Sequence, residues 1–345
     1  MCYYLNIYYT HYAFLPTSLS VVSSPFMHKK YFSSTITIVG IAIFAYLAYT
    51  ISVGYEETLA AISRLGFIGI WFILGLSLVN YGLRFIRWHW YLSIAEYQDL
   101  TLRRSLRYYL AGFAFTTTPG KAGEMIRSIF LKNHNVSYPQ SLSLFFVERL
   151  SDLLATLLLG ALILLYFDGY EQWIIVPVVG AITLLAIMHQ QKLIMIIQKW
   201  VTTKISSHFK HLFDLVVHSR QLLKYHFLYG GLGLGLIAWA AEGYGFYYIL
   251  QIIGIDVSLP LAMGIYSISL IIGALSFLPG GLGGTEAAML ILLGLVDAGH
   301  EEALAATLIC RFATLWFAVA LGAIAMVGLK IPEPDQKDEE PILSK

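Results

Sequence analysis

Long apolar runs are the feature that most constrains what this chain can fold into. A helix needs about 20 apolar residues to cross roughly 30 Å of hydrocarbon. Runs of that order cover residues 34–53, 66–86, 141–167, 173–190, 227–251 and 302–329. Charged residues make up only 12% of the chain, against about 25% in soluble domains. We therefore expect an all-α polytopic membrane protein, placed in the inner (plasma) membrane of a cell.

Two further apolar stretches, 105–131 and 259–297, are interrupted by Pro-Gly pairs. Proline removes a backbone donor and glycine loosens a helix. At membrane depth, the freed backbone groups must be buried in protein or face a wet cavity. Each stretch is therefore predicted to form a re-entrant helical hairpin, which dips into the membrane and returns to the same side.

The distribution of Lys and Arg predicts which loops face the cytoplasm. Segments 84–107 and 191–226 are rich in both residues, and positively charged loops stay inside. The opposite loops are poor in positive charge and carry acidic residues; they are 54–65, 168–172 and 297–302. About six full transmembrane helices, with the N- and C-termini both cytoplasmic, satisfy every loop. In this arrangement the first hairpin enters from the cytoplasm and the second from outside.

The ends of the chain have a different character from its apolar body. Residues 1–26 are rich in tyrosine and contain no Lys or Arg, so they are predicted to be either a start-site artefact, with translation beginning at Met27, or a disordered tail. Residues 27–330 form the membrane domain. Within it, 191–226 is predicted to be a basic amphipathic helix, lying on the cytoplasmic leaflet or packed on the bundle. The acidic segment 331–345 is expected to be disordered.

The two broken stretches share a motif. Each reads Pro-Gly-x-x-Gly and then a glutamate, Glu124 in the first and Glu286 in the second. Each glutamate precedes a deeply placed arginine, Arg149 or Arg311, by 25 residues. Because the hairpins are expected to enter from opposite sides, the units form an inverted repeat, as in many transporters. The residues that make the breaks are Pro119, Gly120, Gly123, Pro279, Gly280, Gly281 and Gly283.

A charge at mid-bilayer costs about 2.5–3.5 kcal/mol, so Arg149 and Arg311 each need a partner or a wet cavity. One interpretation is that their planar guanidinium groups capture a lipid phosphate. The other is internal pairing, of Arg149 with Asp152 or Glu124 and of Arg311 with Glu286. The two interpretations are compatible, since a paired arginine can exchange its carboxylate for a phosphate.

The two hairpin glutamates also have two open interpretations. Each is either a protonatable gate or an N-cap at a helix start, where negative charge is favoured. Glu148 and Asp152 lie four residues apart and share a helix face. The candidate lipid-binding and translocation residues are Glu124, Arg127, Glu148, Arg149, Asp152, Glu286 and Arg311.

Other polar and aromatic side chains are predicted to have ordinary membrane roles. Arg84, Arg87, Lys121 and Arg127 are expected to act as anchors at the cytoplasmic rim, where they could also gather anionic headgroups. The cluster 88–91 is typical of an interfacial aromatic belt. The glycines of segment 231–235 form a GxxxG pattern, which favours close helix packing.

No motif for chemistry is present in the sequence. A P-loop, a His-Glu-x-x-His zinc site and a Gly-x-Ser-x-Gly elbow are all missing from it. The chain has two cysteines, too few for a disulfide framework or a cysteine zinc site. Its net charge of +1 gives no reason to expect nucleic acid as a partner. We expect no metal, no cofactor and no enzymatic activity.

The motif regions resemble the lysylphosphatidylglycerol synthase transmembrane-region family, the flippase-like membrane domain of bacterial multiple-peptide-resistance proteins. The resemblance spans roughly residues 35–330, and its residues are 119–124, Arg127, 148–152, 278–283, Glu286 and Arg311. It implies translocation of a lipid or a lipid-linked sugar. Family members that add lysine to phosphatidylglycerol carry a soluble acyltransferase-like domain. The sequence given has no such domain, which favours a stand-alone member without aminoacyl transfer.

Three functions remain open from the sequence. The first is a flippase that moves an anionic phospholipid or a polyprenyl-linked glycolipid through a midplane cavity. The second is a membrane-embedded enzyme acting on a lipid phosphate. The third is an accessory protein that partners envelope-synthesis enzymes of glycan or lipid pathways.

Overall fold

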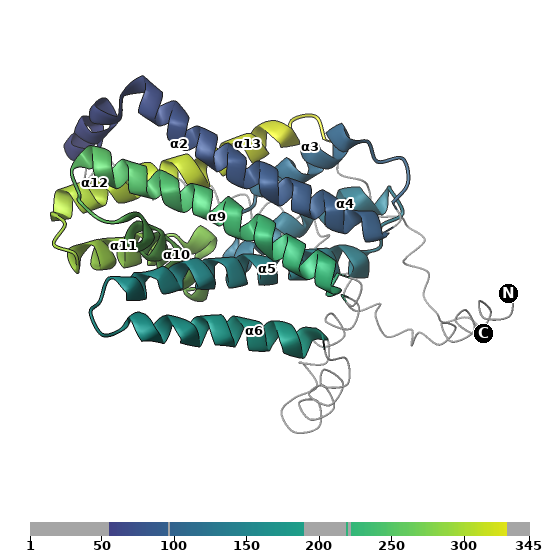
Figure 1. The fold of residues 1–345 in the computed structure, drawn as a ribbon. Helices are drawn as coiled ribbons and strands as arrows, with labels where there is room; N and C mark the ends of the chain where they lie inside the picture. The colour runs from purple at the N-terminus through teal and green to yellow at the C-terminus, as the bar shows by residue number, and fades with distance from the viewer. Residues whose placement is uncertain (1–54, 96, 190–218, 220–221, 330–345) are drawn as a thin grey trace, which may run out of the picture. The chain divides into compact units, whose positions relative to one another are not determined.

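The computed structural model describes residues 55–95, 97–189, 219 and 222–329. Every element in this part of the chain is helical and none is a strand, which confirms the all-α prediction. The longer helices are α2 (Tyr55–Leu92), α3 (Leu102–Phe113), α5 (Tyr138–Gly160), α6 (Ile175–His189), α9 (Tyr225–Ile253), α10 (Leu259–Leu275), α11 (Gly284–Gly294), α12 (His300–Arg311) and α13 (Phe317–Met326). Shorter helical elements are η2 (Ser93–Ala95), η3 (Pro119–Ile126), α4 (Arg127–Lys132), η4 (Ala161–Leu165), η5 (Glu171–Ile174), η8 (Pro279–Gly281) and the π-helix η9 (Phe312–Trp316). Figure 1 shows their arrangement.

By length and hydropathy alone, two helices of the described residues could cross a membrane: Thr58–Ala95 and His300–Met326. The stretches Glu171–Ala186 and Leu259–Leu275 are shorter apolar helices. The number of full spans therefore stays a prediction. The predicted run 34–53, segments 1–26 and 331–345, and most of 191–226 lie outside the described residues.

Helix α2 is longer than the apolar run that predicted it. It is kinked at Gly66, whose φ of 61° and ψ of −179° are not helical. A side chain at φ near +60° is strained, whereas glycine adopts this conformation without a steric penalty. The stretch from Gly66 to Leu92 is about 40 Å long at 1.5 Å per residue, enough to cross the hydrocarbon layer with some tilt.

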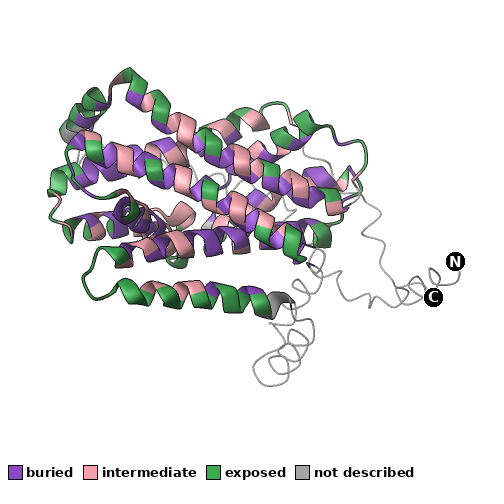
Figure 2. Ribbon diagram, in the orientation of Figure 1, coloured by how far each residue is buried: buried purple, intermediate pink, exposed green. Residues whose placement is uncertain are grey.

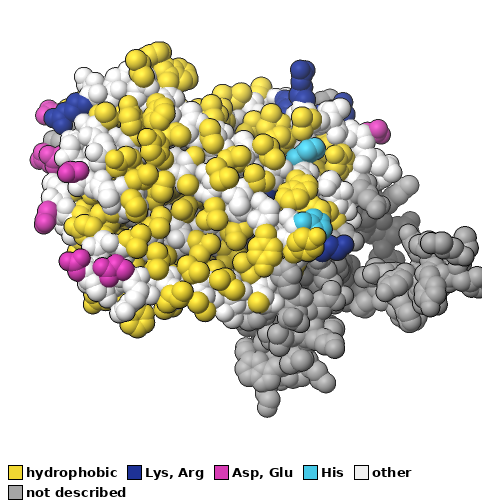
Figure 3. All heavy atoms as spheres, in the orientation of Figure 1, with side chains coloured by type: hydrophobic (Ala, Val, Ile, Leu, Met, Phe, Trp, Pro, Cys, Tyr) yellow, Lys and Arg dark blue, Asp and Glu magenta, His cyan; other side chains and the backbone are white. Residues whose placement is uncertain are grey.

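Large apolar side chains cover much of the exposed surface. Figure 2 shows exposed residues along the outer side of α6, and Figure 3 shows apolar side chains spread over this face of the molecule. On α6 the exposed large side chains include Ile175, Val176, Val179 and Ile182. Continuous apolar surface of this kind is costly in water and is what lipid tails contact in a membrane protein.

The GxxxG segment of α9 packs closely on α2, as predicted. A Cβ built at Gly231 would lie 1.6 Å from the hydroxyl oxygen of Tyr91, and one built at Gly235 would lie 2.9 Å from Nη1 of Arg87. The missing side chains thus make room for a buried tyrosine and a buried arginine of α2. Figure 1 shows α9 running alongside α2.

Both Pro-Gly stretches form broken helices. In the first, α3 ends at Phe113 and a turn leads into η3 and α4; in the second, α10 ends at Leu275 and η8 leads into α11. Proline stands at the start of η3 and of η8, where its missing N–H costs nothing. The breaks lie where the sequence predicts them, while the re-entrant course of the hairpins and their inverted relation stay predictions.

Candidate functional site

The two helix breaks meet each other in the described part of the chain. Gly280 of η8 has a φ of +64°, and a Cβ built on it would lie 3.2 Å from Cα of Thr117, in the turn before η3. The close approach of the two backbones therefore depends on glycine at this position. Segments 160 residues apart in the sequence, each beginning Pro-Gly, are thus brought together.

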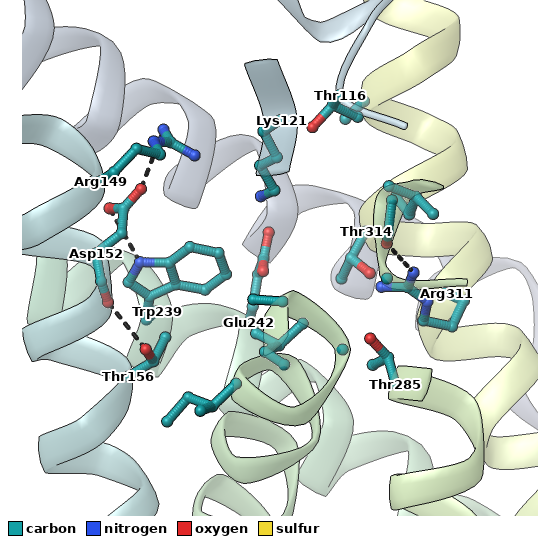
Figure 4. A pocket seen from close by; sticks show the side chains of 18 of the residues that line it. Thr116, Lys121, Arg149, Asp152, Thr156, Trp239, Glu242, Thr285, Arg311 and Thr314 are labelled. Carbon is teal, nitrogen blue, oxygen red and sulfur yellow. Dashed lines mark hydrogen bonds and ion pairs between the residues drawn. The ribbon is translucent and has the colours of Figure 1, made fainter. Parts of the chain in front are cut away.

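A cavity of about 380 Å³ opens beside this meeting point. Its walls include residues of both helix breaks, η3 and η8, and of α2, α5, α9, α10 and α12, and Figure 4 shows side chains that line it. The charged groups in its lining are Arg84, Lys121, Arg149, Asp152, Glu242 and Arg311. Four cations against two carboxylates make the wall net positive, so an anion is the ligand that its charge favours.

Arg149 bridges the first hairpin and its own helix. Its Nη2 lies 3.1 Å from Oδ2 of Asp152, one turn along α5, and 3.6 Å from Oε2 of Glu124 in η3. Thr116 donates a hydrogen bond of 2.8 Å to the other oxygen of Glu124. The pairing that the sequence offered for Arg149 is therefore present with both of its proposed partners.

Asp152 is the carboxylate on which the most groups converge. Arg87 donates to its Oδ1 at 2.7 Å and Arg84 to its Oδ2 at 3.3 Å. The indole N–H of Trp239, on α9, donates to Oδ1 at 3.2 Å. With Arg149, three guanidinium groups share this one carboxylate, so it joins α2, α5 and α9 around the cavity.

Arg127 and Glu148 form a second layer of charge in the first half. Nη2 of Arg127 donates to Oε2 of Glu148 at 3.0 Å and lies 3.6 Å from Oε2 of Glu124. Both residues are buried and neither lines the cavity. Glu148 pairs with Arg127, and Arg127 in turn lies against Glu124. This arrangement favours a role in positioning Glu124 over direct contact with a ligand.

Arg311 fixes the second hairpin. Its Nε donates to Oε1 of Glu286 at 2.7 Å, and its Nη2 donates to the carbonyl of Gly280 at 3.0 Å. The other oxygen of Glu286 accepts the N–H of Gly283 at 2.7 Å, at the start of α11. Glu286 is therefore both the expected capping residue and the expected partner of Arg311.

The capping interpretation is wrong for Glu124. This residue lies in the last turn of η3, whose N-cap is Thr118. Its oxygens are taken by Thr116, Arg127 and Arg149 instead. The reason is local: η3 starts at Pro119, so Glu124 lies six residues after the N-cap Thr118, beyond the first turn in which a capping carboxylate lies.

The structure also corrects the anchoring roles predicted on α2. Arg84 and Arg87 do not lie at an exposed rim: both are buried and paired with Asp152. The same anchoring prediction is wrong for Arg127, which is buried and paired with Glu148. Trp88 is buried as well, and its ring lies 5.5 Å from the guanidinium carbon of Arg127. An aromatic face stabilises a guanidinium away from water, so this part of the aromatic cluster supports the charged site rather than the membrane interface.

Three charged residues that line the cavity were missed as site residues: Arg84, Lys121 and Glu242. The sequence places Glu242 deep in an apolar run but offers no partner for it. In the structure Tyr266 of α10 donates to its Oε2 at 2.5 Å. No fixed sequence spacing links a tyrosine on one helix to a glutamate on another, so this pair could not be predicted. The one signal in the sequence is the presence of a glutamate within an apolar run, which is typical of a functional residue.

Within residues 55–329 as far as they are described, no cluster of three or more His, Cys, Asp and Glu side chains could hold a metal ion. The donor groups of the cavity are guanidinium and ammonium groups, which bind anions. The charge of the candidate site therefore favours an anion.

Comparisons with known proteins agree with the helical, lipid-facing fold. A family model described as the lysylphosphatidylglycerol synthase TM region matches residues 37–322. A UPF0104 membrane protein of Methanothermobacter thermautotrophicus (strain Delta H) is 22% identical over 257 residues, which cover 66% of this chain and 76% of that protein. Another match to a UPF0104 membrane protein of this organism is 31% identical over 91 residues, 26% of this chain and 27% of that protein. The family model covers most of the chain, including both Pro-Gly breaks and both arginines, and the chain belongs to the lysylphosphatidylglycerol synthase TM region family.

Proposed function

We propose that this membrane protein is flippase-like and carries the headgroup of an anionic lipid across the bilayer through the charged cavity. The lipid would be an anionic phospholipid or a polyprenyl-phosphate-linked glycolipid. One observation carries the proposal: Arg149 and Arg311, each following a hairpin glutamate by 25 residues, line the same cavity. A phosphate in that cavity would therefore meet one arginine from each half of the chain.

The state of Arg149 supports a role in binding. Its side chain is 21% exposed, whereas that of Arg311 is 4% exposed. Its Nε and Nη2 make no hydrogen bond within the described part of the chain, although Nη2 lies near two carboxylates. Both nitrogens are buried, and a buried donor without a hydrogen bond is costly. A phosphate that displaced one of these carboxylates would accept from the guanidinium group in planar geometry.

The rim of the cavity supports a lipid as the ligand. Leu153 of α5, Leu275 at the end of α10 and Leu278 before η8 all line it. They are also 49%, 69% and 46% exposed, respectively. A cavity with charged side chains on its wall and an apolar, exposed rim suits a molecule whose headgroup enters while its acyl chains stay in the hydrocarbon.

Transport in vesicles tests the proposal. The purified full chain would be reconstituted into phosphatidylcholine vesicles that carry a trace of fluorescent phosphatidylglycerol. Dithionite added outside quenches only the label in the outer leaflet, so the rate at which inner-leaflet label becomes accessible is the translocation rate. We expect this rate to exceed that of protein-free vesicles, and to exceed the rate for fluorescent phosphatidylcholine because the cavity wall is net positive. Equal rates with and without protein for the anionic probe would refute the proposal.

A further inference from the structure

Glu242 differs from the other buried carboxylates around the cavity. Glu124, Glu148, Asp152 and Glu286 each lie within 3.6 Å of an arginine nitrogen. Glu242 is 5% exposed and accepts a hydrogen bond from Tyr266, but it has no ion pair within the described residues. An ionised carboxylate without a counter-charge is costly at this depth. The carboxylate of Glu242 must therefore be neutralised by a proton or by a cation that is not fixed to it.

The titratable and charged groups that line the same cavities as Glu242 come from α2, η3, α5, α10 and α12. They are Tyr81 and Arg84 of α2, Lys121 of η3, Arg149 and Asp152 of α5, Tyr266 of α10, and Cys310 and Arg311 of α12. In the structure the three arginines pair with carboxylates other than Glu242: Arg84 and Arg149 with Asp152, and Arg311 with Glu286.

Lys121 is the cation that remains. It forms no ion pair with the described residues, and its Nζ lies 5.6 Å from the centre of the Trp239 ring. Figure 4 shows the side chains of Lys121 and Glu242 pointing toward one another in the cavity. The lysine is therefore free to serve either the carboxylate or an incoming anion.

The backbone of Lys121 gives a second, independent reason to assign it a role. Its φ is +56°, in the left-handed region that is unfavourable for residues with a side chain. The corresponding residue of the second motif is Gly281, with a φ of +67°. A lysine at a position that favours glycine stores strain, and such strain is concentrated at functional sites.

We infer that Glu242 is a proton-binding site coupled to headgroup binding, with Lys121 as the cation that Glu242 and the lipid phosphate share. This inference rests on the proposed function. In the empty cavity, the ammonium of Lys121 balances the carboxylate of Glu242. A phosphate that binds Arg149 and Lys121 removes that balance, and Glu242 takes up one proton from the water that reaches the cavity. When the headgroup leaves, the proton leaves and Lys121 again faces Glu242.

The coupling has a definite stoichiometry and direction. One proton binds with each singly charged headgroup, so the net charge of the loaded cavity equals that of the empty one. Proton and lipid cross together, and an acidic compartment drives lipid away from itself. Because coupling between two sites is reciprocal, a lower pH also strengthens headgroup binding.

A pH gradient across the vesicles tests the coupling. Fluorescent phosphatidylglycerol would be added to the outer leaflet of proteoliposomes whose membrane potential is clamped with valinomycin and equal potassium. With the outside one pH unit more acidic, we expect inward translocation to rise by up to about tenfold, as one proton accompanies each lipid. Glu242→Gln should lose this response. Asp256→Asn, an exposed carboxylate between α9 and α10, is the matched control and should keep it.

A second variant keeps the test decisive if Glu242→Gln does not fold. Tyr266→Phe retains the carboxylate and removes the donor that stabilises its ionised form, so the pH at which translocation is half-maximal should move upward. Equal translocation with and without a gradient in the wild type would overturn the coupling while leaving the proposed function intact. A gradient response that survives in Glu242→Gln would overturn the assignment to Glu242. No translocation of the probe at all would overturn the proposed function, and this inference with it.

Discussion

At the scale of single residues, the two arginines of the motif are not equivalent. Arg311 is held by Glu286 and by the carbonyl of Gly280, through two hydrogen bonds of 2.7 and 3.0 Å. Arg149 lies near two carboxylates but forms no hydrogen bond through its Nε or Nη2 within the described residues. Arg311 is therefore fixed within the second hairpin, whereas the guanidinium group of Arg149 is less completely hydrogen-bonded.

Substitution by lysine should separate these two roles. Lysine keeps the charge but cannot reach two acceptors in fixed directions, so Arg311→Lys should lower stability by about 1–3 kcal/mol. Arg149→Lys should cost about 1 kcal/mol or less, while translocation of fluorescent phosphatidylglycerol falls by about tenfold as a charge-assisted contact is lost. Thermal unfolding in detergent and the vesicle assay measure the two effects. Wild-type rates for both variants would show that the arginines are structural.

The residue pairs that the sequence predicts are those with a regular spacing. The equal separations of Glu124 from Arg149 and of Glu286 from Arg311 indicated both pairs. The partners of Asp152 on α2 could not be found in this way, because they lie 65 and 68 residues away on another helix. Arg84 and Arg87 were instead interpreted as loop anchors, from the rule that positively charged loops stay in the cytoplasm. That rule does not take into account that an arginine can pair with a buried carboxylate.

At the scale of elements, helix breaks and glycine contacts shape the cavity. The Pro-Gly breaks are local features, so the sequence predicts where α3 and α10 stop. The π-helix η9, between α12 and α13, has no comparable signal. It begins directly after Arg311, and the hydroxyl of Tyr81 donates to the carbonyl of Thr314 within it. The Tyr81 hydrogen bond therefore lies where the backbone departs from α-helical geometry. Such π-bulges are frequent at functional sites.

Glycine contacts between elements give a prediction with a matched control. A Cβ built at Gly322 of α13 would lie 2.1 Å from the backbone nitrogen of Ala114, which follows α3. Gly322→Ala should therefore separate α13 from the first hairpin and cost about 1–3 kcal/mol through overpacking. Gly233 of α9 has no atom within 4 Å of its Cβ position, so Gly233→Ala should be neutral or stabilise the helix by up to about 1 kcal/mol.

The temperature at which half of each purified variant aggregates in detergent measures the difference. A stability equal to wild type for Gly322→Ala would mean that α13 moves away from the first hairpin at no cost. A loss of stability in both variants would show that each glycine serves flexibility rather than close contact.

At the scale of the whole described unit, exposed charges divide between its two ends. Figure 3 shows acidic side chains gathered at the end where α2 and α12 begin, and Lys and Arg gathered mainly toward the other end. The exposed acidic residues include Glu56, Asp168, Glu171, Asp297, Glu301 and Glu302, and the exposed basic ones include Arg103, Arg104 and Lys224. This division supports the orientation predicted from the loops, although the number of full spans is not fixed by length and hydropathy.

Cysteine labelling tests that orientation directly. Both native cysteines would be replaced, Cys310 by alanine because it is buried, and single cysteines introduced by Asp168→Cys and Arg104→Cys. Because positively charged loops stay in the cytoplasm, an impermeant thiol reagent should label position 168 in intact cells. It should label position 104 only after permeabilisation. Labelling of position 104 alone in intact cells would reverse the orientation, and labelling of both would place the two ends on one side. The second result would leave the inverted repeat without a basis, because its two hairpins could no longer enter from opposite faces of the membrane.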